Sequence, residues 1–102
     1  MNNTMNHRRA VMTPKADKIT EIEELLKRCE AQINLKKAEG GPLSWYASFE
    51  ESTNLFFVDS VFADEESLAF HASNIGPILK DLQPLLAGPP ETTVHPVFSI
   101  AE

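Results

Sequence analysis

Apolar residues recur at spacings of three and four between Ala16 and Lys37. The series is Ile19, Ile22, Leu26, Cys29 and Ile33, widened by Leu25. This spacing places the apolar side chains on one side of an α-helix of about five turns. Asp17 precedes the series and is the expected N-cap, while Gly40-Gly41-Pro42 marks the end of the segment. The pattern therefore predicts one amphipathic helix over residues 16–37.

Two runs typical of β-strands follow, over Leu43–Glu50 and Leu55–Ala63, and four polar residues connect them. This arrangement predicts a hairpin. The first run alternates, with its apolar set at Leu43, Trp45, Ala47 and Phe49. The second run is apolar on both sides and leaves only Asp59 and Ser60 polar, so both of its faces have to be covered.

The remaining chain predicts a second helical region and two further strands. Asp64 is the expected N-cap of a helix, and a break is expected over Ser73–Pro77 because a proline disfavours helical geometry at the residue before it. A second helical piece is expected over Ile78–Leu86. Thr92–Ala101 predicts a last strand, irregular or at a sheet edge because of Pro96. Asn6–Thr13 is interpreted as the opening strand.

The resulting order is βαββαβ, which predicts a ferredoxin-like α+β fold with an antiparallel sheet and both helices on one face. The other face would be left bare although it contains phenylalanine and valine side chains. Packing two such sheets together is the simplest way to cover it, so we expect a homodimer in the form of a dimeric α+β barrel. Residues 1–102 are interpreted as a single domain, with residues 1–6 as a flexible N-terminus.

Composition narrows the function classes. A net charge of −6 argues against a nucleic-acid partner. No apolar run is long enough to cross a membrane, and the N-terminal segment lacks the features of a secretory signal, so we expect a cytoplasmic protein. Cys29 is the single cysteine and lies in the apolar helical series, which indicates a core position. No pair of side chains has metal-ligand spacing on one helix, so no metal site is expected.

Four segments together resemble the antibiotic biosynthesis monooxygenase (ABM-like) domain family. Residues Thr13–Lys18 resemble its entry into the first helix, and Leu43–Tyr46 resembles its second strand, which commonly carries a tyrosine. Val61–His71 resembles its passage from the third strand into the second helix, with an aromatic residue, an aspartate and a histidine at matching places. Gly88–Glu91 resembles a frequent exit from that helix.

The resemblance implies a dimeric barrel and oxygenation of quinol-like or polyphenol-like aromatic compounds without a metal or flavin cofactor. Fold alone does not fix function. The sequence departs from the family at Ser60, where many members carry an acidic residue, and at Phe62, where many carry tryptophan. Both differences remove polar groups that could hold or deprotonate a phenolic substrate.

Two residues are candidates for catalysis. His71 is the candidate base, since it lies three residues after Leu68 and four before Ile75 and so shares their apolar stripe. We expect it to line or close a cavity with Tyr46 nearby and with Asn74 or Asp59 as a further neighbour; the alternative is a structural histidine. Tyr46 is the candidate hydrogen-bond donor to an oxyanion, with a wall or interface tyrosine as the alternative.

Four further residues, Asn74, Asp59, Phe62 and Trp45, are candidates for binding the substrate. Trp45 is also explained by core packing, and Asn74 by capping of a helix after the break. A symmetric hairpin would place Asp59 opposite Tyr46 on one face, while a bulge would reverse this. Asp59 is then either a pocket carboxylate with a raised pKa or a solvated residue at a strand end.

Three functions follow, in order of preference. The first is a cofactor-independent monooxygenase acting on a small aromatic or quinol-like substrate. The alternative is a non-catalytic dimer that binds a small apolar ligand or only assembles. The third is a haem-degrading enzyme of the same superfamily, which fits poorly because Phe62 replaces a tryptophan and no histidine follows His71 on its helix.

Overall fold

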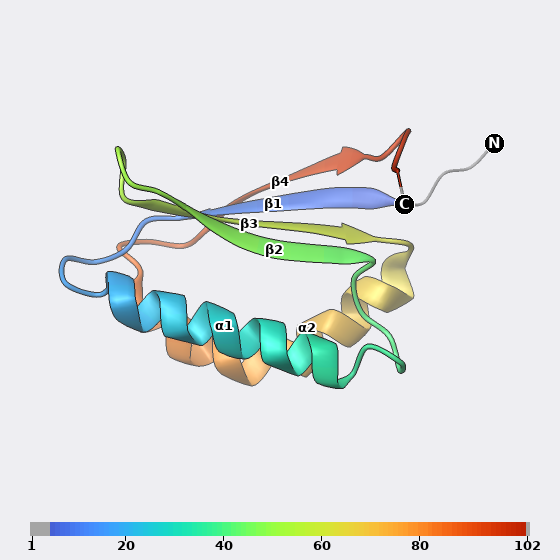
Figure 1. Ribbon diagram of the computed structural model, residues 1–102, viewed down its shortest axis with the longest axis horizontal. Helices are drawn as coiled ribbons and strands as arrows, with labels where there is room; N and C mark the ends of the chain where they lie inside the picture. Colours follow the sequence, from blue (N-terminus) through green and yellow to red (C-terminus); the bar gives the residue numbers. More distant parts are fainter. Residues whose placement is uncertain (1–4, 102) are drawn as a thin grey trace.

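The computed structural model describes residues 5–101 and contains one four-stranded antiparallel sheet with two long helices. The elements in chain order are β1 (Asn6–Met12), α1 (Ile19–Leu35), β2 (Ser44–Glu50), β3 (Leu55–Phe62), α2 (Glu65–Leu82), the short 3₁₀ helix η1 (Gln83–Leu85) and β4 (Glu91–Pro96). The strands lie side by side in the order β2-β3-β1-β4 (Figure 1). The predicted ferredoxin-like βαββαβ fold, including the opening strand, is confirmed.

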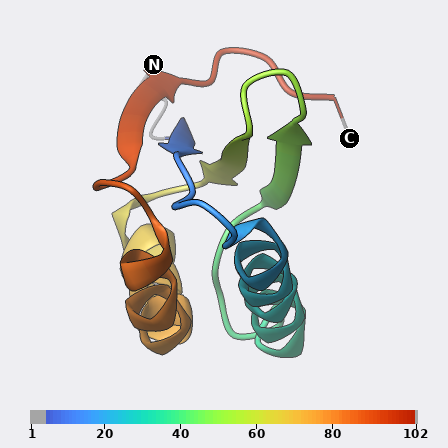
Figure 2. The ribbon, with the colours of Figure 1, turned by 90° about the vertical axis from the view of Figure 1, so that its left-hand side faces the viewer.

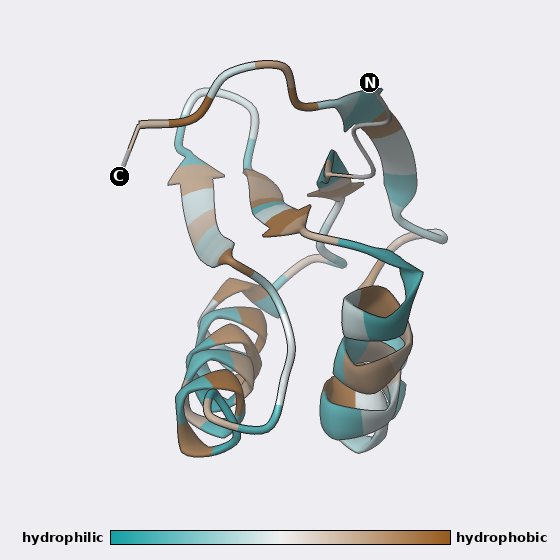
Figure 3. Cartoon of the chain, turned by 90° about the vertical axis from the view of Figure 1, so that its right-hand side faces the viewer, coloured by the Kyte–Doolittle hydropathy of each residue, from teal (hydrophilic) through white to brown (hydrophobic). Residues whose placement is uncertain are grey.

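Both helices lie against the same face of the sheet, and the opposite face carries no helix (Figure 2). Hydrophobic and hydrophilic stretches alternate around each helix, as expected for helices that cover a sheet on one side (Figure 3). No helix among the described residues is long and apolar enough to cross a membrane. We call the two sides of the sheet the helix face and the open face.

The pairing of the strands decides which side chains reach each face. Tyr46 pairs with Asp59, and Asp59 pairs with Arg9 on the other side of β3. One residue along, Trp45 pairs with Ser60, and Ser60 pairs with Arg8. Since successive strand residues point to opposite faces, the Tyr46 row belongs to the open face and the Trp45 row to the helix face.

The two-sided apolar pattern of β3 is explained by this register. Phe56 and Phe62 are buried under the helices at 2% and 3% exposure. Leu55, Phe57 and Val61 alternate with them and are only half-buried on the open face. The predicted hairpin between β2 and β3 is confirmed and spans residues 51–54; of the two alternatives considered, it is the symmetric one.

The core lies between the helix face and the two helices. Its buried apolar residues form two adjacent clusters, one of Met12, Ile22, Leu26, Phe56, Leu82 and Leu86 and the other of Cys29, Ile33, Ile75 and Ile78. The predicted core series of α1 is therefore largely buried, with Ile22 fully inaccessible and Cys29 1% exposed.

The predicted start of the first helix is wrong. Asp17 does not cap α1; it adopts a left-handed conformation with φ of 65° in the turn that precedes the helix. Lys18 is the N-cap and makes no side-chain capping bond. Aspartate tolerates left-handed geometry better than most residues, which explains its place in this turn.

The predicted break near Pro77 is also wrong, because α2 continues from Glu65 to Leu82. Ile75, Ile78 and Leu82 are buried on both sides of Pro77 and hold the helix in one piece against α1 and the sheet. Pro77 is exposed, so the hydrogen bond it cannot donate is lost on the solvent side. Asp64 caps α2 as predicted, since its Oδ1 accepts from the backbone N–H of Ser67 at 2.8 Å.

The last strand is shorter than predicted, because β4 ends at Pro96 and residues 97–101 form no strand. Its position at the sheet edge beside β1 agrees with the prediction made from Pro96. Phe98, beyond the strand, is 97% exposed. Residues 1–4 lie outside the described residues, so the flexible N-terminus stays a prediction.

Candidate functional site

A cavity of about 220 Å³ lies between the helix face of the sheet and the two helices. Its walls are mainly apolar and come from every strand and both helices. The residues that matter for its chemistry are Arg8, Trp45, Ser60, Phe62 and His71. An apolar cavity of about 150 Å³ is enough to hold benzene, so this one is suited to a small aromatic compound.

His71 projects from α2 toward this cavity, as the stripe of Leu68 and Ile75 predicts. Its ring meets the ring of Phe62 edge to face, with centroids 5.1 Å apart. Its Nδ1 is buried and has no hydrogen-bond partner among the described residues. Burial lowers the pKa of His71 to about 4, and the positive charge of Arg8 acts in the same direction. At neutral pH, His71 is therefore an uncharged imidazole that can accept a hydrogen bond from a ligand.

A row of side chains crosses the sheet beneath His71. Trp45 on β2, Ser60 on β3 and Arg8 on β1 are consecutive partners in the register, and all three line the cavity. Ser60 is 7% exposed. Sequence reasoning missed Arg8, although its alternation with Ala10 and Met12 in the opening strand was a usable signal.

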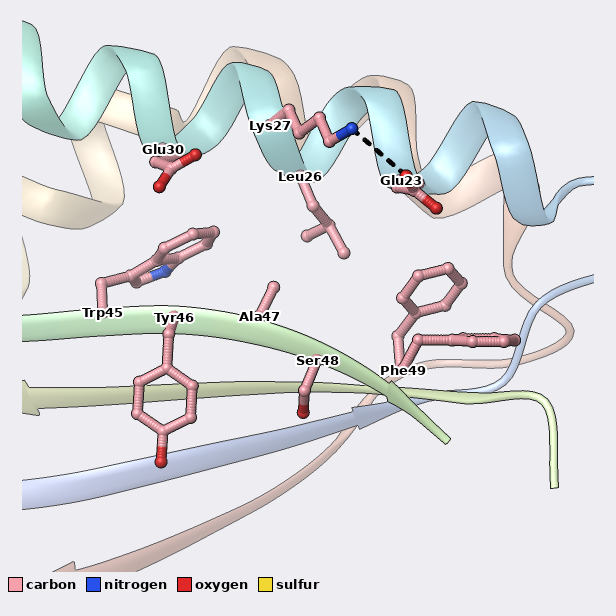
Figure 4. Close-up of a pocket in the computed structure, with 10 residues that line it drawn as sticks. Glu23, Leu26, Lys27, Glu30, Trp45, Tyr46, Ala47, Ser48 and Phe49 are labelled. Atoms are coloured by element: carbon pink, nitrogen blue, oxygen red, sulfur yellow. Dashed lines mark ion pairs between the residues drawn. The ribbon is translucent and has the colours of Figure 1, made fainter. Parts of the chain in front are cut away.

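Tyr46 and Asp59 do not reach this cavity, contrary to the expectation that they lie near His71. They face each other on the open side of the sheet, as the symmetric hairpin predicted. Tyr46 is 57% exposed, and in Figure 4 it points away from α1 while Trp45 points toward it. Five of the six predicted site residues are thus divided between the two faces, and the sixth, Asn74, lies between the helices.

Asp59 fits neither of the two environments considered for it. It is 3% exposed, and its Oδ1 accepts hydrogen bonds from His7 Nε2 at 2.8 Å and Arg9 Nε at 3.0 Å. Burial alone would raise the pKa of this carboxyl, but the bonds from Arg9 and His7 hold it below its usual range. Asp59 is a buried, ionised carboxylate, and its Oδ2 has no partner among the described residues.

Asn74 joins the two helices instead of facing the cavity or capping a helix. Its Oδ1 accepts from Gln32 Nε2 at 2.7 Å, and its Nδ2 donates to the backbone oxygen of Gln32 at 3.3 Å. Both the oxygen and the nitrogen of the side-chain amide are used in this contact. Asn74 therefore positions α2 on α1.

A second hollow of about 330 Å³ opens at the edge of the sheet, between α1 and β2. Trp45, Ala47 and Phe49 line it from the strand, and the exposed ion pair of Lys27 with Glu23 at 3.2 Å lies on its rim (Figure 4). Trp45 also lines the inner cavity, so its indole is a shared wall as well as a packing element of the core. No group of three or more His, Cys, Asp or Glu side chains suited to a metal ion occurs within residues 5–101.

No protein-family model matches the sequence. A search of curated proteins also finds no match. Solved structures, however, match over almost the whole chain.

A structure from Caulobacter crescentus that carries the provisional name antibiotic biosynthesis monooxygenase has a TM-score of 0.82 at 18% identity, covering 95% of this chain and 92% of that one. One from Nitrosomonas europaea with the same provisional name has a TM-score of 0.81 at 14% identity, covering 96% and 94%. A variant of SnoaB, a cofactor-independent oxygenase from Streptomyces nogalater, has a TM-score of 0.75 at 14% identity, covering 95% and 96%. At these identities the comparison establishes the fold: this chain is built like proteins named antibiotic biosynthesis monooxygenases.

Proposed function

We propose that the protein is a cofactor-independent monooxygenase that oxidises a small hydroquinone-like substrate in the cavity between sheet and helices. The observation that carries the proposal is the uncharged His71, which lines a mainly apolar cavity and whose buried Nδ1 has no partner within residues 5–101. A buried polar atom of this kind is costly unless a ligand satisfies it. The aromatic ring of a phenol would fill the cavity, and its hydroxyl would donate a hydrogen bond to Nδ1 of His71.

The chemistry needs no reductant besides the substrate. A hydroquinone and one dioxygen give a hydroxyquinone and one water, and the four electrons taken up by oxygen all come from the hydroquinone. His71 accepts the hydroxyl proton, which leaves an electron-rich anion that can pass an electron to dioxygen. The apolar walls exclude water from the reacting pair.

The structural neighbours support this class of reaction. SnoaB is a cofactor-independent oxygenase by its printed name, and it shares the fold across nearly the whole chain. The substrate of this protein is inferred only from the size and lining of its own cavity. That volume lies below the roughly 300–1,000 Å³ typical of pockets for drug-sized ligands, which disfavours a haem substrate.

We also propose that two copies associate through the open face. Leu55, Phe57 and Val61 are only half-buried there, and Tyr46 is exposed. The Oδ2 of Asp59, which has no hydrogen-bond partner within residues 5–101, lies on the same face and would gain one if the second copy placed a donor there. Small compact proteins rarely leave such a sheet face uncovered.

Oxygen uptake with a panel of one-ring and two-ring hydroquinones tests the activity. We expect uptake above the buffer rate and a decrease of about 10²-fold or more in His71→Ala, the loss expected for a general base. His95→Ala is the matched control, because His95 is exposed on the open face and should keep full activity. Equal rates in wild type and His71→Ala would contradict the assignment of His71.

One observation favours the alternative of a binding module. A pKa of about 4 makes His71 a weak base in the empty cavity. Tight binding of the same hydroquinones, seen as quenching of Trp45 fluorescence, without any oxygen uptake would support that alternative. Trp45 is the single tryptophan of the chain and lines both this cavity and the outer hollow, so quenching that weakens in His71→Ala assigns the binding to this cavity.

A further inference from the structure

Resting on the proposed function, we infer that Arg8 is a substrate-binding residue that selects phenols by holding the ring oxygen as a phenolate opposite His71. Arg8 and His71 line the same cavity from its two sides, Arg8 from β1 in the sheet and His71 from α2. The substrate oxygen would lie between an acceptor and a fixed positive charge.

Arg8 is a cation without a protein partner. The structure gives it no hydrogen bond or ion pair within residues 5–101, although its side chain is half-buried beside an apolar cavity. Arginine stays charged at any physiological pH. A charge in such a place is costly unless a counter-ion binds, and a guanidinium is well matched to an anionic oxygen.

The neighbouring Arg9 shows the contrast. Arg9 points to the open face, donates to Asp59 at 3.0 Å and lies over the ring of Phe57 at 4.9 Å. Its charge is compensated within the protein. The charge of Arg8 is left for a ligand.

The carboxylates around Arg8 favour a neutral molecule over an anion. Arg8 also lines a second pocket of about 220 Å³ on the β4 side, together with Asp64, Glu65, Phe62 and Leu68. Its two carboxylates lie at the start of α2, and that of Asp64 is kept ionised by its bonds from Ser67. A carboxylic acid, ionised in water, would meet this negative rim, whereas a phenol would pass it uncharged.

Inside the cavity, the phenol hydroxyl donates its proton to Nδ1 of His71. The imidazole becomes an imidazolium and the phenol a phenolate, so charge and protons balance. Arg8 stabilises the anion as it forms, and the anion in turn makes the protonated imidazole more favourable. The phenolate beside the imidazolium therefore makes proton transfer to His71 more favourable than the low basicity of His71 in the empty site indicates.

The test uses 4-nitrophenol, whose ionisation is visible in its absorbance and occurs near neutral pH. We expect wild-type protein to bind it preferentially as the phenolate and to lower the pKa of the bound probe. In Arg8→Gln the ionisation constant of the bound probe should fall about tenfold or more, one pKa unit, with Arg8→Lys intermediate. Arg28→Gln is the matched control, because Arg28 is exposed on α1 outside this cavity.

Two further probes separate charge from shape. The ether 4-nitroanisole should bind wild type and Arg8→Gln equally, as measured by Trp45 quenching, which also shows that the variant is folded. The anion 4-nitrobenzoate should bind more weakly than 4-nitrophenol. An unchanged ionisation of bound 4-nitrophenol in Arg8→Gln, or tighter binding of the benzoate, would overturn the inference. None of these measurements needs oxygen, so a failure of oxygenation alone contradicts only the proposed reaction.

Discussion

At the scale of single residues, the charged side chains of Arg9 and Asp59 on the open face are paired with each other, whereas Arg8 on the helix face lines the cavity. Arg8 and Arg9 are neighbours in β1, yet one lines the cavity and the other is paired with Asp59 on the open face. The division follows from the alternation of a strand, which sends successive side chains to opposite sides. An arginine paired with a buried aspartate and an arginine without a partner within residues 5–101 thus arise one residue apart.

The environment of His71 predicts how stability depends on pH. Its pKa of about 4 in the folded protein lies below the ordinary value of 6.5. Between pH 6.5 and 4, the unfolded chain binds a proton that the folded protein does not, so the free energy of unfolding should fall as the pH is lowered through this range.

Urea denaturation at several pH values measures this effect. In His71→Leu, which fills the site without a titrating group, the fall between pH 6.5 and 4 should become smaller. His95→Leu is the control and should keep the pH dependence of the wild type. An identical pH profile in wild type and His71→Leu would show that His71 is not held neutral by burial.

At the scale of elements, α1 packs its apolar side chains against the sheet. Leu26 is 4% exposed and belongs to the core cluster that includes Met12 and Phe56. Leu26→Ala should lower the free energy of unfolding by roughly 2–5 kcal/mol through loss of burial and formation of a cavity. Leu35→Ala is the control, because Leu35 on the same helix is 73% exposed. Chemical denaturation measures both, and a loss below about 1 kcal/mol for Leu26→Ala would mean that this packing is wrong.

Element type was predictable because local spacing decides it. The three-and-four spacing of Ile22, Leu26 and Cys29 is visible in the sequence, and so is the alternation around Trp45. The continuity of α2 through Pro77 was not predictable, because it depends on Ile75 and Ile78 being buried against other elements. Local propensity indicated a break there, and tertiary packing prevented it.

The candidate site was predictable in part. His71 follows from its place on a helical stripe, and Phe62 and Trp45 follow from strand alternation. Adjacent strand residues point to opposite faces, so Trp45 and Tyr46 could not both point from β2 toward the helices and into the inner cavity, and the sequence already contained that information. Strand alternation places Arg8 on the same face as Ala10 and Met12, but its position beside Ser60 in the cavity wall depends on the pairing of β1 with β3, which links residues more than fifty positions apart.

At the scale of the whole molecule, the half-buried apolar side chains of the open face predict that two copies form a dimer through it. Phe57 is half-buried on that face, and its replacement by Asp places a charge in the proposed contact between two copies. We expect wild type to be a dimer at micromolar concentration in light scattering and Phe57→Asp to be a monomer or an aggregate. Ala31→Asp, on the exposed side of α1, is the control and should stay dimeric. A stable wild-type monomer would contradict the proposed dimer.

We propose that the cavity beneath His71 carries out oxygenation without a metal or flavin. Turnover of a hydroquinone under isotopically labelled dioxygen, in the presence of a metal chelator, tests this proposal. We expect one labelled oxygen atom in each hydroxyquinone, the other in water, and loss of this product in His71→Ala. A hydroxyquinone without the label, or no product from hydroquinones that quench Trp45, would contradict it.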